Sequence, residues 1–180
     1  RSTRVRSSAA SDVYKEEQEL LEIAAIVHDI GIKVSEEKYN SSAGKYQELE
    51  GPREAEKLLA ALGYEKTFID KVCYLVGHHH TYENIDSLPY RILVEADFLV
   101  NLYEDNSSRR AAEQAYEKIF RTKSGKNLLK IMFLTPKTVL IHHSILSVKK
   151  WCKKWVKTLD NALKKCYFNG VGYMIIKVNK

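Results

Sequence analysis

The chain has 180 residues, of which 44 % are hydrophobic and 29 % are charged, and its formal net charge is +6. This length suits one domain, or one domain with an appendage, and the composition excludes wholesale disorder and fibrous proteins. No apolar run approaches the roughly 20 residues that span a bilayer, and the basic, Ser-rich start has no apolar core typical of a secretory signal.

The first predicted helix runs from Asp12, an acceptable N-cap, to the neighbourhood of Gly31, with apolar side chains at helical spacing. Residues 33–50 are rich in small and polar side chains and are predicted to form a long loop. Such loops inside a compact domain are usually functional or mobile. Pro52 is then expected in the first turn of a second helix, which Gly63 closes.

Four more helices are predicted downstream. They are expected to begin near Thr67, Pro89, Ser107 or Ser108, and Gly125. The third predicted helix ends in the triplet His78-His79-His80, and the fourth has an inward stripe of Leu93, Ala96, Val100 and Tyr103. No repeat of 20–50 residues is present, so a solenoid is excluded. The sequence predicts an all-α bundle.

Pro136 marks the predicted end of the helical bundle, and the net charge of the chain changes sign there. Residues 1–134 hold 19 basic and 22 acidic residues, a net charge of −3, whereas residues 135–180 hold ten lysines and one acid, a net charge of +9. In this C-terminal extension Trp151 and Trp155 follow helical spacing among lysines, which favours an amphipathic helix docked on the bundle. Contact with an anionic surface, nucleic acid or lipid headgroups, is the alternative, although no nucleic-acid-binding motif is present.

Cysteine usage indicates the compartment. The chain has an odd number of cysteines, Cys73, Cys152 and Cys166, and none of them is separated from another by the short spacing of a metal site. Disulfide-stabilised secreted domains typically have an even number of cysteines that pair with one another. We therefore expect a reducing, cytoplasmic location.

His28 and Asp29 stand where the apolar first helix gives way to Gly31. A lone histidine there is more often a core residue than a ligand. The neighbouring carboxylate needs a cation or several donors when it leaves water, and the helix dipole at a C-terminal end disfavours an anion. A bound metal ion would relieve both costs.

Asp97 is a second acid in an apolar stretch, on the inward stripe of the fourth predicted helix. It either caps another helix or pairs with an arginine such as Arg91, or it is a metal ligand that faces His28 and Asp29 across the bundle. Mixed imidazole and carboxylate ligands suit Mn, Fe, Ni, Co or Zn more than Ca or Cu(I).

The segments AAIVHDIGI, GHHHTYENID and VEADFLVN together resemble the HD-domain superfamily of metal-dependent phosphohydrolases, in particular a small bacterial-type subgroup. The resemblance covers roughly residues 13–134 and does not reach the C-terminal extension. It implies an HD-domain helical bundle, in which His28, Asp29 and Asp97 bind the principal metal ion.

Members of this superfamily with two metal ions have further ligands. The resemblance places these at Glu50 and at the pair His79-His80, with His78 as the alternative register. It implies one or two divalent ions among Fe, Mn, Ni, Co, Zn and Mg. A histidine triplet at one helix end is rarely structural, since like charge and desolvation oppose packing it without a partner.

Two positions depart from the family pattern. An earlier histidine of the family corresponds to Arg1 when Val5 and Ala9 are aligned with the residues that follow it, and arginine cannot ligate a metal. Either the site lacks a ligand, which puts the activity in question, or the N-terminal stretch is not the native one. Ile32 stands where many members have a lysine, and Lys33 points about 100° away on a helix.

The resemblance implies hydrolysis of a phosphate ester in a nucleotide or another small phosphorylated metabolite, with a metal-activated water as nucleophile. Asp29 is expected to bridge two ions or orient that water, and Lys45 to neutralise the substrate, unless Lys45 is a solvated loop residue. One alternative is a catalytically impaired HD-domain binding module, whose basic tail contacts an acidic partner or nucleic acid. Another is a di-iron HD-domain oxygenase, since its ligands are of the same kinds.

Overall fold

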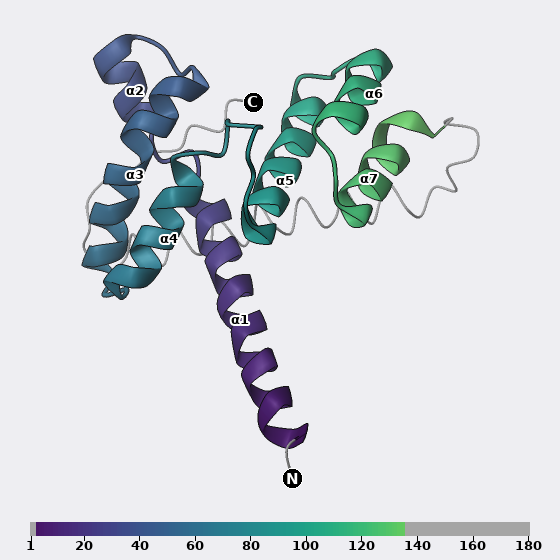
Figure 1. Cartoon of the computed structure of the whole chain (residues 1–180). Helices are drawn as coiled ribbons and strands as arrows, with labels where there is room; N and C mark the ends of the chain where they lie inside the picture. The colour runs from purple at the N-terminus through teal and green to yellow at the C-terminus, as the bar shows by residue number, and fades with distance from the viewer. Residues whose placement is uncertain (1–2, 136–180) are drawn as a thin grey trace. The chain divides into compact units, whose positions relative to one another are not determined.

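The structure is a computed structural model that describes the backbone of residues 3–135 and the side chains of residues 15–135. Within these residues it is all-α, which confirms the predicted fold class (Figure 1). The helices are α1 (Thr3–Val27), α2 (Ile32–Tyr39), α3 (Gly44–Ala61), α4 (Lys66–Val76), α5 (Leu88–Glu104), α6 (Arg109–Lys118), α7 (Lys123–Leu129) and a π-helical segment (Lys130–Leu134). None of the described helices is both long and apolar enough to cross a membrane.

The basic C-terminal extension predicted for residues 135–180 lies, beyond Thr135, outside the described residues. Its boundary and its contact with an acidic partner or nucleic acid therefore stay predictions.

Two apolar clusters join the helices. The larger cluster connects α1, α3, α4 and α5, and its buried members are Ala24, Val27, Ala55, Leu59, Ile69, Val72, Leu75, Val76, Tyr90, Leu93 and Val94. The smaller connects the second half of α5 with α6 and α7, and its buried members are Leu102, Ala112, Ala115, Phe120 and Leu129. Helix α5 contributes to both clusters, and Asp97 lies between its two contributions.

The predicted loop at residues 33–50 is wrong, because this stretch forms α2 and the first part of α3. Small residues make the closest contact here, and one aromatic pair, Tyr39 of α2 stacked on Tyr46 of α3 with ring centroids 4.3 Å apart, adds to it. A Cβ on Gly31 would lie 2.8 Å from both the Gln47 carbonyl oxygen and the Gly51 nitrogen, so the α3 backbone contacts this glycine directly. Ser35 of α2 is fully buried. A segment whose buried contacts are made by small and polar residues therefore has the amino-acid composition that is typical of a loop.

The start of a helix at Pro52 is also wrong, since Pro52 lies inside α3. Proline disfavours the α conformation at the preceding residue because its ring meets that residue's Cβ, and Gly51 has no Cβ. The predicted end is confirmed: α3 stops at Ala61, and Gly63 has the positive φ of +83° that favours glycine.

The other predicted helices begin close to the expected residues. Pro89 lies in the first turn of α5, and the Ser108 hydroxyl caps α6 by accepting from the Ala111 N–H at 3.2 Å. Ala96, Val100 and Tyr103, predicted to face inward, are instead exposed, Val100 by 46 % and Tyr103 by 51 %. The second half of α5 instead turns Leu102 and its neighbours toward α6 and α7. Helix α1 begins earlier than Asp12, at Thr3.

A buried carboxylate fixes the connection between α6 and α7. Glu95 of α5 accepts hydrogen bonds from the backbone N–H of Arg121 at 2.6 Å and of Thr122 at 2.9 Å. Its second oxygen accepts from the Thr122 hydroxyl at 2.5 Å. The charge of Glu95 is thereby satisfied by donors at the start of α7, and the smaller cluster is anchored to α5.

Replacing Glu95 by alanine removes these three contacts and leaves two backbone donors without their acceptor. We expect the free energy of unfolding to fall by about 1–3 kcal/mol, measured by urea denaturation followed by circular dichroism. The exposed Glu83 provides the matched control, and Glu83→Ala should change stability by less than about 0.5 kcal/mol. A Glu95→Ala protein as stable as the control would contradict this role.

Candidate metal centre

The end of α1, the turn after α4 and the middle of α5 bring the predicted ligands together. His28 follows the last residue of α1, and its Nε2 lies 3.2 Å from Asp29 Oδ2 and 3.5 Å from Asp97 Oδ1. The partner of Asp97 is therefore this histidine, across the bundle. Asn101, one turn further along α5, donates to Asp97 Oδ2 at 3.1 Å and holds that carboxylate.

His79 and His80 complete the cluster from the turn that follows α4. Ligand atoms of Asp29, His79 and His80 all lie within 4.8 Å of one another. The Asp29 carboxylate joins the two sets of residues: Oδ2 faces His28, and Oδ1 lies 3.7 Å from His79 Nε2. The rings of His28 and His79 meet edge to face, with centroids 5.3 Å apart.

Backbone carbonyls fix the ring orientations of two histidines. The Nδ1–H of His28 donates to the Ala25 carbonyl at 3.0 Å, and the Nδ1–H of His79 donates to the Val76 carbonyl at 2.7 Å. A carbonyl only accepts, so Nδ1 carries a proton in both rings. Each Nε2 consequently faces the carboxylates, which is the orientation that a metal-binding histidine needs.

Two buried nitrogens at the cluster lack partners, and this tests whether a metal fits. Nε2 of His79 and Nε2 of His80 are buried and have no hydrogen-bond partner among the described residues. The 3.7 Å from His79 to Asp29 exceeds hydrogen-bond length. A buried polar atom without a partner is costly, whereas a metal ion would accept the lone pair of each nitrogen. The residues present therefore fit a divalent cation.

The electrostatics of the cluster favour a positive charge between Asp29 and Asp97. Burial alone lowers the pKa of a histidine, but the contacts of His28 with these two carboxylates outweigh it and raise the pKa of His28 to about 10. Burial likewise raises the pKa of Asp29, but its contacts with His28 and His79 hold that pKa well below its usual range. Burial and the neighbouring His79 lower the pKa of His80, a direction that favours the neutral ring that ligates metals.

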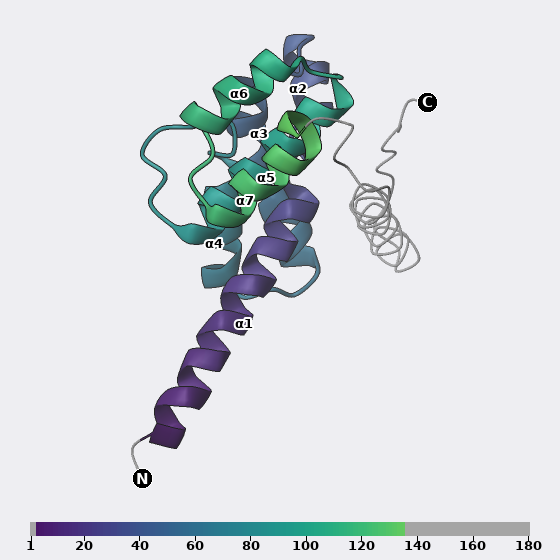
Figure 2. The same ribbon diagram turned by 90° about the vertical axis from the view of Figure 1, so that its right-hand side faces the viewer.

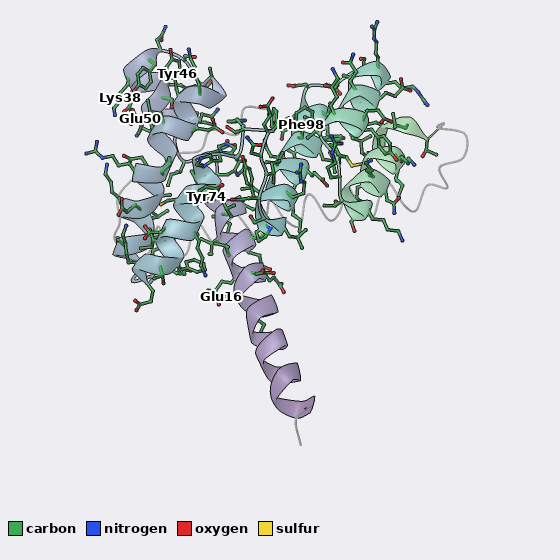
Figure 3. The ribbon with its side chains drawn as sticks, in the orientation of Figure 1. Glu16, Lys38, Tyr46, Glu50, Tyr74 and Phe98 are labelled. Carbon is green, nitrogen blue, oxygen red and sulfur yellow. The ribbon has the colours of Figure 1, made fainter. Side chains whose placement is uncertain are left out.

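Two other predicted ligands have different surroundings. The Glu50 carboxylate accepts from Lys38 Nζ at 2.6 Å and from the Tyr39 hydroxyl at 2.8 Å. Figure 3 labels Lys38 and Glu50 beside each other on α2 and α3. The structure therefore does not bring Glu50 into the group of Asp29 and the two histidines. His78, the alternative in the histidine triplet, turns the other way: its Nδ1–H donates to the Tyr74 carbonyl at 2.7 Å.

Lys45, the predicted substrate-binding residue, lies in the first turn of α3. Its side chain is exposed, and Nζ lies 4.6 Å from the centre of the Tyr46 ring. Gly44, next to it, packs against the cluster, since a Cβ there would lie 2.7 Å from the His80 ring. Lys33 is also exposed, and its Nζ lies 3.9 Å from Glu37 Oε1 within α2.

The start of α1 lies far from the cluster. Helix α1 has 25 residues, which span roughly 37 Å at 1.5 Å per residue, and the cluster is at its C-terminal end. Figures 1 and 2 both show the first half of α1 extending away from the other described helices. Arg1, predicted at the position of the family's first histidine, is outside the described residues.

Sequence reasoning missed three residues that support the cluster. They are Asn101, Gly44 and Glu48; Glu48 accepts from the backbone N–H of His80 at 2.9 Å. The contact of Asn101 with Asp97 could have been predicted, because residues four apart on a helix lie on the same face. The other two act across the contact between α3 and the turn after α4, which sequence spacing alone does not reveal.

Comparison with models of protein families matches residues 5–115 to the HD domain. This range begins in α1, ends in α6 and contains every residue of the cluster. No curated protein and no solved structure matches the chain.

In the metal-free protein we expect His28 to remain protonated at pH 8. Because its folded pKa of about 10 lies above the ordinary value of 6.5, its pairing stabilises the fold fully below about pH 6.5 and is lost as the pH rises through about 10. NMR titration of the imidazole C–H resonances measures this pKa. Asp97→Asn should move the pKa of His28 down, and a wild-type value near 6.5 would contradict the shared-carboxylate geometry.

Proposed function

The chain belongs to the HD-domain family, a superfamily of metal-dependent phosphohydrolases, and from this premise we propose that it hydrolyses a phosphate ester of a nucleotide or another small phosphorylated metabolite. The observation that carries the proposal is the cluster itself. Imidazole and carboxylate groups from three separate elements converge, and two of the imidazole nitrogens are buried without a partner.

The proposed site has two sets of ligands that share one residue. His28, Asp29 and Asp97 would hold the principal ion, and Asp29 with His79 and His80 would hold a second. When bound, a divalent ion supplies a water of lowered pKa and polarises a phosphoryl oxygen. Fe, Mn, Ni, Co, Zn and Mg are the proposed candidates, and the mixed donor set favours the transition metals among them.

Asp29 has the central role in this proposal. Its two oxygens face His28 and His79 respectively, which is the arrangement that a bridging carboxylate needs. Its side chain is also 49 % exposed, so one carboxylate reaches both histidines and the solvent from which a substrate arrives. Its lowered pKa makes it a weak proton acceptor, so its proposed role is to bind and orient.

The first turn of α3 supports an anionic substrate. Gly44 contacts the His80 ring, and the N-cap residue Ala43 provides no side-chain cap for the helix. The positive end of the helix dipole therefore lies beside the cluster without a side-chain cap. Lys45 adds a positive charge at the same turn. A phosphate group bound there would lie next to the proposed second ion.

The neighbouring histidines His78 and His79 allow a matched test of the metal centre. We expect the wild-type protein to contain a transition metal by mass spectrometry and to release phosphate or a phosphomonoester from a panel of nucleotides and sugar phosphates. His79→Ala should lose metal and at least a hundredfold in activity, since a buried ligand is removed. His78→Ala, outside the cluster, should retain both within about threefold.

Equal losses in the two histidine variants would contradict the proposed ligand set. A wild-type protein that binds no divalent metal under any condition would contradict the proposed function. Oxygen consumption by an iron-loaded protein, without phosphate release, would instead support the di-iron oxygenase alternative.

Lys45→Ala tests the proposed substrate position. Loss of one cation beside a bound phosphate should raise KM about tenfold at low salt and leave the metal content unchanged. Lys33→Ala, another exposed lysine, is the control and should leave KM unchanged. An unchanged KM for Lys45→Ala would show that Lys45 is a solvated side chain.

A further inference from the structure

The turn after α4 carries two histidine ligands but is not part of a helix. Helix α4 ends at Val76, and the turn is closed by the Thr81 N–H, which donates to the His78 carbonyl at 2.8 Å. The ring of His79 is fixed by its bond to Val76. His80 makes no such ring hydrogen bond within the described residues, so its position depends on what holds the backbone of the turn.

Glu48 of α3 holds that backbone from one side. One of its oxygens, Oε1, accepts from the His80 N–H at 2.9 Å and from the Thr81 hydroxyl at 3.0 Å. Both donors lie more than 30 residues away along the chain. The carboxylate of Glu48 therefore joins α3 to the backbone of a ligand residue.

Tyr90 of α5 holds the turn from the other side. Its side chain is buried, and its hydroxyl lies 2.8 Å from the His78 carbonyl oxygen and 2.6 Å from the Thr81 carbonyl oxygen. The hydroxyl has one proton, which the two carbonyls share. Tyr90 therefore contacts both ends of the segment that contains the two ligands.

We propose that Glu48 and Tyr90 are positioning residues, which hold the turn after α4 so that its two histidine ligands face the carboxylate of Asp29. The inference rests on the proposed metal centre and names the residues that orient its second ligand set. Neither side chain need touch the metal or the substrate. Glu48 acts through the backbone of His80, and Tyr90 acts through the carbonyls that flank the pair.

The role of Glu48 is separable from its charge, because glutamine keeps a side-chain oxygen acceptor of the same length. We expect Glu48→Ala to weaken Co²⁺ binding about 10–100-fold, as loss of an outer support of a metal site does, and to change the visible spectrum of the bound ion. Glu48→Gln should bind Co²⁺ within about threefold of the wild type, with the same spectrum. Glu54→Ala, another glutamate of α3, which pairs with Lys57, is the control.

Tyr90→Phe is the second variant, because it keeps the buried ring and removes only the hydroxyl. It should also weaken Co²⁺ binding, with a thermal transition that remains cooperative. Unchanged affinity and spectrum in both Glu48→Ala and Tyr90→Phe would overturn the proposal. An equal loss in Glu48→Gln and Glu48→Ala would also overturn it, since charge rather than hydrogen bonding would then be responsible.

Hydrogen exchange of the His80 backbone amide separates this inference from the proposed function, because it needs no metal. In the metal-free protein the His80 N–H should exchange at least tenfold faster in Glu48→Ala than in the wild type, and at a near-wild-type rate in Glu48→Gln. If wild-type protein binds no Co²⁺ while the amide behaves as expected, the proposed metal centre is wrong, but Glu48 still holds the backbone of the turn. If the exchange rate of the amide does not respond to Glu48→Ala, the proposal itself fails.

Discussion

The contact on which the site depends is the sharing of His28 by two carboxylates. Asp29 lies beside it in sequence, and Asp97 comes from α5, so the imidazole ties the end of α1 to the middle of another helix. Two carboxylates at partly buried positions repel each other unless a positive charge lies between them. A proton on His28 provides that charge in the metal-free protein, and a divalent cation would provide more of it.

The apolar packing explains why these charged groups stay close. Helix α5 contributes one part of its length to each of the two apolar clusters, and Asp97 lies between those parts. The close approach of α3 to the same region depends on glycine, since Gly31 meets the α3 backbone and Gly44 meets the His80 ring. A side chain at either glycine would force the helices or the ring to shift. Helix packing thus positions the two turns, after α1 and after α4, that carry the histidines of the site.

Much of this arrangement was predictable from the sequence, and the errors have physical causes. Apolar spacing and capping residues such as Ser108 locate most helices, and acids in apolar surroundings indicate His28-Asp29 and Asp97 as a site. The helices of residues 33–50 were not predictable, because their closest contacts are made by small residues that also fill loops. Glu50 was expected to be a ligand from its alignment alone, and only the structure shows its carboxylate on Lys38 and Tyr39.

The central claim is that residues from three elements form one metal centre around Asp29. Anomalous X-ray diffraction from crystals grown with Mn²⁺ tests this most directly, because it locates the ion and its ligands without assuming an activity. The account predicts a peak coordinated by His28, Asp29 and Asp97, and at full loading a second peak on the His79 and His80 side of Asp29. An ion bound elsewhere, with these side chains unliganded, would contradict the account.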